Sequence, residues 1–118
     1  MKATLLLMNR APYAGTLARA GLDAALAYAA FDQSVSVLFA GPGVLQLAPA
    51  QEPAAIGRKS LRRLIDSMPL YDLEAVYADS EALDRHGLAE DDLPAFVTVL
   101  DPAAQRELQD RHEHLLAF

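Results

Sequence analysis

Apolar runs and helical apolar stripes alternate along this chain, and together they predict strands alternating with helices. The clearest strand signal is the unbroken apolar run LLLM that ends at Met8, which is typical of a strand covered on both faces. Residues 34–40 (SVSVLFA) contain β-branched side chains, and the Gly-Pro-Gly sequence that follows ends a second strand. The predicted strands are residues 1–8, 34–40, 72–78, 95–100 and 114–118.

Helices are predicted between these strands, and several of them carry recognisable end signals. Thr16 is a candidate N-cap for the first helix, and Asp101 followed by Pro102 opens the last one. Gly87 suits the left-handed position after the third helix. Residues 43–53 are predicted to be a loop or one short turn. The predicted helices are residues 16–31, 54–67, 79–86 and 101–113.

The first predicted helix, residues 16–31, is apolar on most of its sides. A helix that is apolar on most sides is buried on most sides. In so small a domain the sheet covers only one of those sides, so we infer that another subunit covers the rest. The candidate residues for this interface are Leu22, Leu26 and Tyr28.

The alternation of strands and helices indicates a single three-layer α/β domain over residues 1–118, with a mainly parallel sheet of about five strands. The flavodoxin-like order 2-1-3-4-5 is the strand order that we expect. Ligands and reactive groups in such sheets gather at the carboxyl ends of the strands. These ends fall at residues 9–15, 41–51, 79–80 and 101.

Composition narrows the classes of function. The chain has 118 residues, of which 53% are hydrophobic, and a net charge of −6, which disfavours broad contact with nucleic acid or an anionic membrane. It contains no cysteine, which excludes a disulfide, a thiolate metal site, a catalytic thiol and a persulfide carried on this chain. The N-terminal apolar run is too short for a signal peptide, and no run is long enough to span a bilayer, so a cytoplasmic protein is expected.

The sequence carries none of the common site motifs of α/β sheets. No G-x-G-x-x-G follows a strand, and the segment after the first strand lacks both a hydroxyl-rich phosphate loop and an acidic cluster. His112 and His114 are two residues apart, so on a helix they do not share a face. We therefore predict no metal site, no cofactor and no catalytic residue.

Two charged features have a simple and a functional interpretation. Asp79 directly follows the third strand, and its simpler role is the N-cap of the next helix. A basic run on the helix predicted over residues 54–67 is spaced as i,i+4 pairs, and a solvated face is the simpler interpretation, with contact to RNA or a partner protein as the alternative. The run consists of Arg58, Lys59, Arg62 and Arg63.

Five short motifs follow one another along the chain: GLDA at 21–24, GVLQL at 43–47 followed by Gln51 and Pro53, LYDLE at 70–74, LDRHGL at 83–88 and LLAF at 115–118. Each motif alone is weak. In this order and spacing they resemble TusC/DsrF-type subunits of the DsrE/DsrF-like sulfur-relay family, and the resemblance covers almost the whole chain.

The resemblance implies a DsrE-like fold and assembly with two sister subunits, TusB-like and TusD-like, into a heterohexamer built as a dimer of trimers. In the Tus system this complex relays persulfide sulfur to a downstream acceptor protein for 2-thiolation of the tRNA wobble uridine; in the related Dsr system it serves sulfur oxidation. The sulfur is received on a sister-subunit cysteine after the third strand, and Asp79 stands at the matching position here. Because a carboxylate cannot hold sulfane sulfur, the resemblance implies a structural or docking subunit.

Alternatives remain at this point. The chain is alternatively a stand-alone homo-oligomer that binds a small ligand in a candidate pocket formed by Asn9, Gln46 and Ser80, beside Asp79. An enzyme acting alone needs a reactive group that we do not find. The choice between tRNA thiolation and sulfur oxidation also stays open, as does an indirect contact with tRNA.

Overall fold

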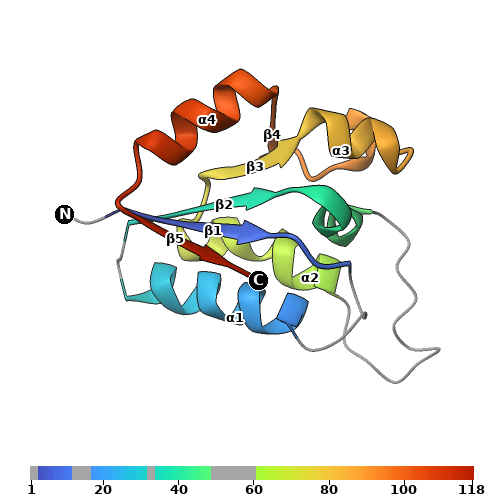
Figure 1. Ribbon diagram of the computed structural model, residues 1–118. Helices are drawn as coiled ribbons and strands as arrows, with labels where there is room; N and C mark the ends of the chain where they lie inside the picture. The colour runs from blue at the N-terminus through green and yellow to red at the C-terminus, as the bar shows by residue number, and fades with distance from the viewer. Residues whose placement is uncertain (1–2, 12–16, 32–33, 49–60) are drawn as a thin grey trace.

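A computed structural model of the chain describes residues 3–11, 17–31, 34–48 and 61–118, and the structural statements below concern these residues. Its centre is a five-stranded sheet in which every neighbouring pair is parallel, in the order β4-β3-β2-β1-β5 (Figure 1). The three-layer α/β fold with a five-stranded parallel sheet is therefore confirmed. The strands are β1 (Thr4–Met8), β2 (Val35–Phe39), β3 (Val76–Asp79), β4 (Thr98–Leu100) and β5 (His114–Ala117).

The expected strand order 2-1-3-4-5 is wrong. In that order β3 pairs with β1, whereas here β3 pairs with β2, with Val37 beside Val76. The reason is that β1 has only two edges, and β2 and β5 already occupy them. Strands β1 to β4 therefore advance in one direction across the sheet, and the last connection returns past all of them to place β5 on the far side of β1.

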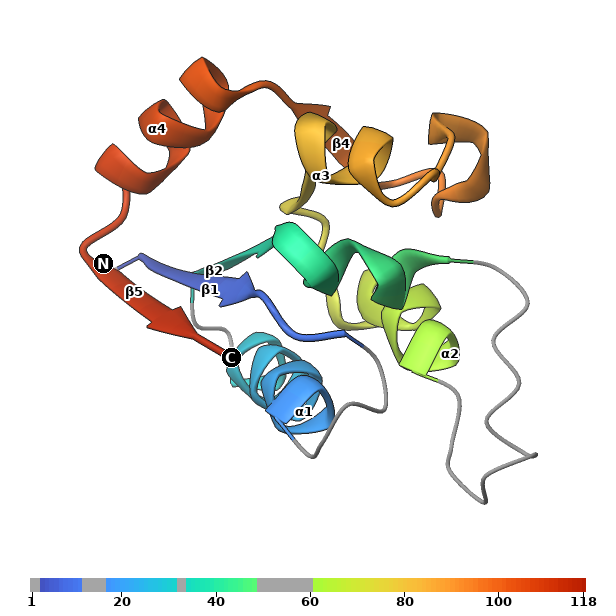
Figure 2. The ribbon, with the colours of Figure 1, turned by 45° about the vertical axis from the view of Figure 1, so that its right-hand side comes forward.

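The described helical segments lie on both sides of the sheet. Helices α1 and α2 lie on one side and α4 lies on the other in both views (Figures 1 and 2). The α-helices are α1 (Leu17–Ala30), α2 (Leu61–Asp66), α3 (Ser80–Arg85) and α4 (Pro102–Asp110). The 3₁₀ segments are η1 (Gly41–Leu47), η3 (Met68–Tyr71) and η4 (Glu90–Asp92). No described helix is both long enough and apolar enough to cross a bilayer.

Two apolar clusters hold these layers together. Alternating strand residues such as Leu6 and Phe39 face α1, and they form the larger cluster together with Leu22 of that helix. Leu5 and its neighbours face the other way and pack against α4 in a smaller cluster. The sheet is thus well covered on the α1 side and thinly covered on the α4 side.

The predicted end signals that fall on described residues are confirmed, whereas Thr16, the candidate N-cap of the first helix, lies outside the described part of the chain. Asp101 accepts a hydrogen bond from the Ala104 backbone N–H at 2.8 Å, and Pro102 begins α4 as expected. Gly87 has a φ of 71°, the left-handed conformation predicted for it. Residues 43–48 of the predicted loop or short turn belong to η1 and its C-cap, and residues 49–53 lie outside the described part of the chain.

Two predicted strands begin later than the sequence pattern indicates. Asp72 has a φ of 61° and its N–H donates to the Pro69 carbonyl, so it ends η3, and β3 starts only at Val76. Val97 likewise donates to the Pro94 carbonyl, which holds residues 95–96 in a turn before β4 begins. In both places a local turn competes with the strand for the backbone hydrogen bonds.

Candidate functional site

The carboxyl ends of the strands meet at one edge of the sheet, which is where α/β proteins bind ligands. The residues at this edge include Asn9 after β1, Asp79 at the end of β3, Asp101 after β4 and Phe118 after β5. Because the strands are parallel, the fold gathers segments that are far apart in the sequence. The candidate site lies along this edge.

Asp79 has a structural role at this edge. Its side chain accepts a hydrogen bond from the Glu81 backbone N–H at 3.1 Å, so it is the N-cap of α3, as the sequence predicts. Its Oδ1 also accepts a hydrogen bond from Nε2 of Gln105 at 2.8 Å. The same Nε2 donates to the Leu100 carbonyl at 3.1 Å. Gln105 therefore ties the ends of β3 and β4 to α4, and a carboxylate held in this way serves structure.

Replacing Gln105 by Ala is expected to lower the free energy of unfolding by about 1 kcal/mol, because Asp79 and the Leu100 carbonyl each lose a donor. Urea denaturation measures the change. Gln109→Ala is the matched control, since that side chain is exposed on the same helix. Equal effects of the two substitutions would contradict the role given to Gln105.

Gln46 and Asn9 are linked through the segment that follows β1. Gln46 is fully buried in η1, and its Nε2 donates to the Arg10 carbonyl at 2.8 Å. The Asn9 backbone N–H donates to the Phe118 carbonyl at 2.8 Å, which extends the pairing of β1 with β5. Gln46 therefore fixes where the chain leaves the sheet, and its side chain belongs to the interior.

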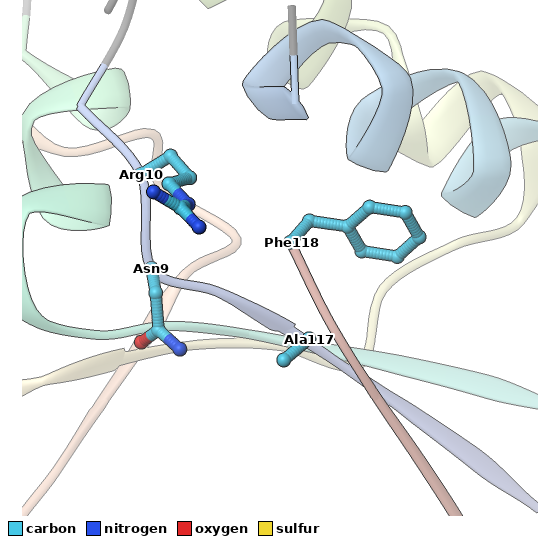
Figure 3. Close-up of a pocket in the computed structure, with 4 residues that line it drawn as sticks. All are labelled: Asn9, Arg10, Ala117 and Phe118. Atoms are coloured by element: carbon cyan, nitrogen blue, oxygen red, sulfur yellow. The ribbon is translucent and has the colours of Figure 1, made fainter. Parts of the chain in front are cut away.

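An open hollow of about 310 Å³ lies beside β1 and β5, and the described residues that line it are Asn9, Arg10, Ala117 and Phe118 (Figure 3). Of the predicted pocket residues only Asn9 lines this hollow. Gln46 is buried, and Ser80 begins α3 at the end of β3, which is separated from β1 by β2. The described lining of this hollow therefore includes neither Gln46 nor Ser80, and a pocket formed by Asn9, Gln46 and Ser80 stays a prediction. Sequence reasoning missed Phe118 because it did not place β5 beside β1.

The predicted subunit interface on α1 also changes. Leu22 is completely buried inside this chain, so its side chain is not available to another subunit, and its assignment to the interface is wrong. Leu26 is half-buried and packs against the larger cluster. Tyr28 is half-buried and lines an apolar groove of about 460 Å³ with Ala24, Ala27 and Phe31. Sequence reasoning missed Phe31, which is 78% exposed at the end of α1.

The basic run is not tested by the structure. Arg58 and Lys59 lie outside the described residues, and Arg62 and Arg63 lie in α2 with side chains that are not described. Contact of this run with tRNA or a partner stays a prediction. Within the described ranges, no three His, Asp or Glu side chains are grouped closely enough to share a metal ion.

The chain is similar in sequence to known proteins over nearly its whole length. The profile of the DsrE/DsrF-like family matches residues 2–118. A "Protein TusC homolog" of Pseudomonas aeruginosa is 38% identical over 119 residues, which cover 100% of both sequences. A "Protein TusC homolog" of Vibrio vulnificus is 36% identical over 112 residues, 95% of each sequence.

Solved structures share the fold at low sequence identity. The crystal structure of the ychN protein from E. coli superposes with a TM-score of 0.87 at 15% identity and covers 100% of both chains. A conserved protein of unknown function from Bacteroides thetaiotaomicron superposes with a TM-score of 0.71 at 15% identity, covering 98% of this chain and 94% of the other. At such identity the superpositions establish the fold alone.

Proposed function

The chain belongs to the DsrE/DsrF-like family, and from this we propose that it is a subunit of a sulfur-relay complex in which another subunit carries the sulfur. The end-to-end similarity to TusC homologs is the observation that carries this proposal. A relay needs a thiolate that accepts and passes on a sulfur atom, and this chain has no cysteine.

The state of Asp79 supports the non-carrying role. The resemblance matches Asp79 to the sister-subunit cysteine, and the Asp79 carboxylate accepts hydrogen bonds from the Glu81 N–H and from Gln105. A carboxylate with these partners stabilises the start of α3 and offers no sulfur nucleophile. We therefore propose a structural or docking role for the chain at this edge of the sheet.

We further propose specific partners for this chain and a specific product of the relay. The sister subunits are TusB-like and TusD-like, the assembly is a heterohexamer, and the sulfur passes through a downstream acceptor protein to the wobble uridine of tRNA. The similarity to TusC homologs favours these partners and this product, because the name TusC belongs to the Tus relay. Sulfur oxidation is the alternative use of the same chemistry.

Native mass spectrometry of the tagged chain, purified from its own host, tests the proposal. We expect two additional small subunits to co-purify, and one of them to carry the mass of an added sulfur atom that a reductant removes. This chain carries no such mass, because it lacks cysteine. Purification without any other subunit would contradict the proposal.

An Asp79→Asn variant separates a structural role from a chemical one in the same experiment. The amide retains an oxygen that accepts from the Glu81 N–H and from Gln105. We expect the sister subunits and their sulfur load to be unchanged within about twofold, a difference of roughly 0.4 kcal/mol by the relation between free energy and equilibrium constant. Loss of the sulfur load with assembly intact would show that the carboxylate takes part in the transfer.

A second candidate function rests on the hollow lined by Asn9 and Arg10. Its volume of about 310 Å³ suits a small ligand. In this alternative the chain works as a homo-oligomer that binds such a ligand at the carboxyl edge of the sheet. Purification as a homo-oligomer without sister subunits would favour it.

A further inference from the structure

An arginine stands directly beyond the end of β1, at the carboxyl edge of the sheet. Arg10 is exposed and lines the open hollow beside β1 and β5. Among the described residues the one ion pair joins Arg19 to Asp23 on α1, so the Arg10 guanidinium has no carboxylate partner there. An exposed arginine is well solvated and needs no partner. The informative feature is therefore how the surrounding chain holds Arg10.

Two segments that are distant in sequence fix the backbone beneath this side chain. Gln46 is fully buried in η1, and its Nε2 donates to the Arg10 carbonyl at 2.8 Å. One residue earlier, the Asn9 N–H donates to the Phe118 carbonyl at 2.8 Å. These bonds fix the point from which the Arg10 side chain leaves the sheet. A binding group on a fixed backbone loses less conformational freedom when its ligand arrives.

The hollow beside Arg10 stays open because Phe118 packs elsewhere. A Cβ built on Gly21 would lie 3.0 Å from Cβ and Cγ of Phe118, so the missing side chain at Gly21 lets Phe118 lie against α1. Figure 3 shows the Phe118 ring turned away from Arg10, whose guanidinium lies over the space between the end of β1 and Phe118. About 310 Å³ is left there, which is at the lower end of the range for small-molecule pockets.

The carboxylates at the same edge of the sheet belong to its other half. Asp79 and Asp101 stand at the ends of β3 and β4, and β2 separates these strands from β1. Both carboxylates accept hydrogen bonds from the first turn of a helix, Asp79 from the Glu81 N–H and Asp101 from the Ala104 N–H. The half of the edge that carries the hollow therefore presents the positive charge of Arg10.

The chemistry of the guanidinium selects the kind of ligand. Its N–H donors lie in one plane and match two oxygens of a carboxylate or of a sulfur or phosphorus oxyanion. We propose that this hollow binds a small anion through a group of that kind, with Arg10 as the residue that contacts it. The proposal names a ligand class for the hollow of the second candidate function and rests on that hollow, but it requires neither a homo-oligomer nor a sister subunit.

Amide NMR of the full-length chain tests the site. The chain is labelled with nitrogen-15, kept in the assembly in which it purifies, and titrated with sodium acetate and with sodium sulfate. Sodium chloride at equal ionic strength corrects for screening of surface charges. We expect saturable shifts of the amide signals at the hollow, namely those of Asn9, Arg10, Ala117 and Phe118. A stronger response to acetate identifies a carboxylate ligand, and a stronger response to sulfate identifies an oxyanion.

Two variants of Arg10 separate its charge from its shape. Arg10→Gln is expected to weaken binding at least about tenfold, because the charge-assisted hydrogen bonds are lost. Arg10→Lys keeps the charge without the planar fork, and we expect an intermediate loss of about threefold. Arg106→Gln is the matched control, since Arg106 is exposed on α4 and the net charge changes by the same amount. Its effect is expected to stay within about twofold.

Shifts that sodium chloride reproduces would overturn the anion site, and so would equal weakening by Arg10→Gln and Arg106→Gln. The anion site and the relay function fail separately. Co-purification of sister subunits with a chain that binds neither anion would overturn the anion site and leave the relay function standing. Anion binding by a chain that purifies without sister subunits would overturn the relay function and leave the anion site standing.

Discussion

Gly43→Ala is expected to lower the free energy of unfolding by about 3 kcal/mol or more, at or above the upper end of the usual range for overpacked sites. A Cβ at this position would overlap the Met8 carbonyl oxygen and lie 2.6 Å from the Met8 carbonyl carbon. These are backbone atoms at the end of β1, and that carbonyl accepts the Ala40 N–H at 3.0 Å. The side chain therefore fits only if η1 moves away from the sheet. Guanidinium denaturation followed by circular dichroism measures the loss.

Gly41→Ala is the matched control in the same 3₁₀ segment. No heavy atom lies within 4 Å of a Cβ built there, but its φ of 51° is left-handed. The expected cost is about 1 kcal/mol, which is the conformational preference alone. If Gly41→Ala proved as costly as Gly43→Ala, backbone conformation would explain both effects and the close approach to Met8 would not.

Leu22→Glu is expected to unfold the isolated chain or leave it in the insoluble fraction. Leu22 is fully buried in the larger apolar cluster between α1 and the sheet. A glutamate there loses the apolar contacts and buries an unpaired carboxyl group, at a cost of about 3–5 kcal/mol. That is a large part of the total stability of about 5–15 kcal/mol of a typical domain. The loss of stability does not depend on assembly with another subunit, because the Leu22 side chain is enclosed by its own chain.

Two further variants allow the effect of burial at position 22 to be measured even if Leu22→Glu does not fold. Leu22→Ala is expected to cost about 2–5 kcal/mol and to remain foldable at the lower end of that range, so denaturant unfolding reports the burial directly. Ala20→Glu places the same charge on the exposed side of α1, and we expect its effect to stay within about 0.5 kcal/mol. Normal stability of Leu22→Glu would show that α1 presents a different side to the sheet.

The local features of the fold could be predicted because short-range chemistry determines them. Asp79 and Asp101 cap helices, and Gly87 is left-handed, each for reasons contained within a few neighbouring residues. The alternation of strands and helices gave the three-layer class, and the short run HLLAF gave β5. The lack of cysteine already determined that this chain carries no persulfide.

The candidate site depended on contacts between residues far apart in the chain, and those were not predicted. Gln105 reaches Asp79 across 26 positions, and Gln46 reaches the Arg10 carbonyl across 36. No pattern in the sequence marks such pairs, because each side chain also suits an exposed helix or loop. For the same reason the sequence did not predict the hollow that Asn9 lines with Phe118, since strand ends were grouped without knowledge of which strands are neighbours.

The sequence by itself determined the secondary-structure alternation, the helix caps, the family resemblance and the absence of a sulfur-carrying thiol. Only the tertiary structure decided which side of α1 is enclosed, so that Leu22 is interior while Phe31 is exposed. It also decided that β5 pairs with the free edge of β1 and is the last strand on that side of the sheet among the described residues. The physical reason is that periodicity and capping are set within one or two turns of chain, whereas strand order and burial are set by competition among distant segments for the same edges and faces.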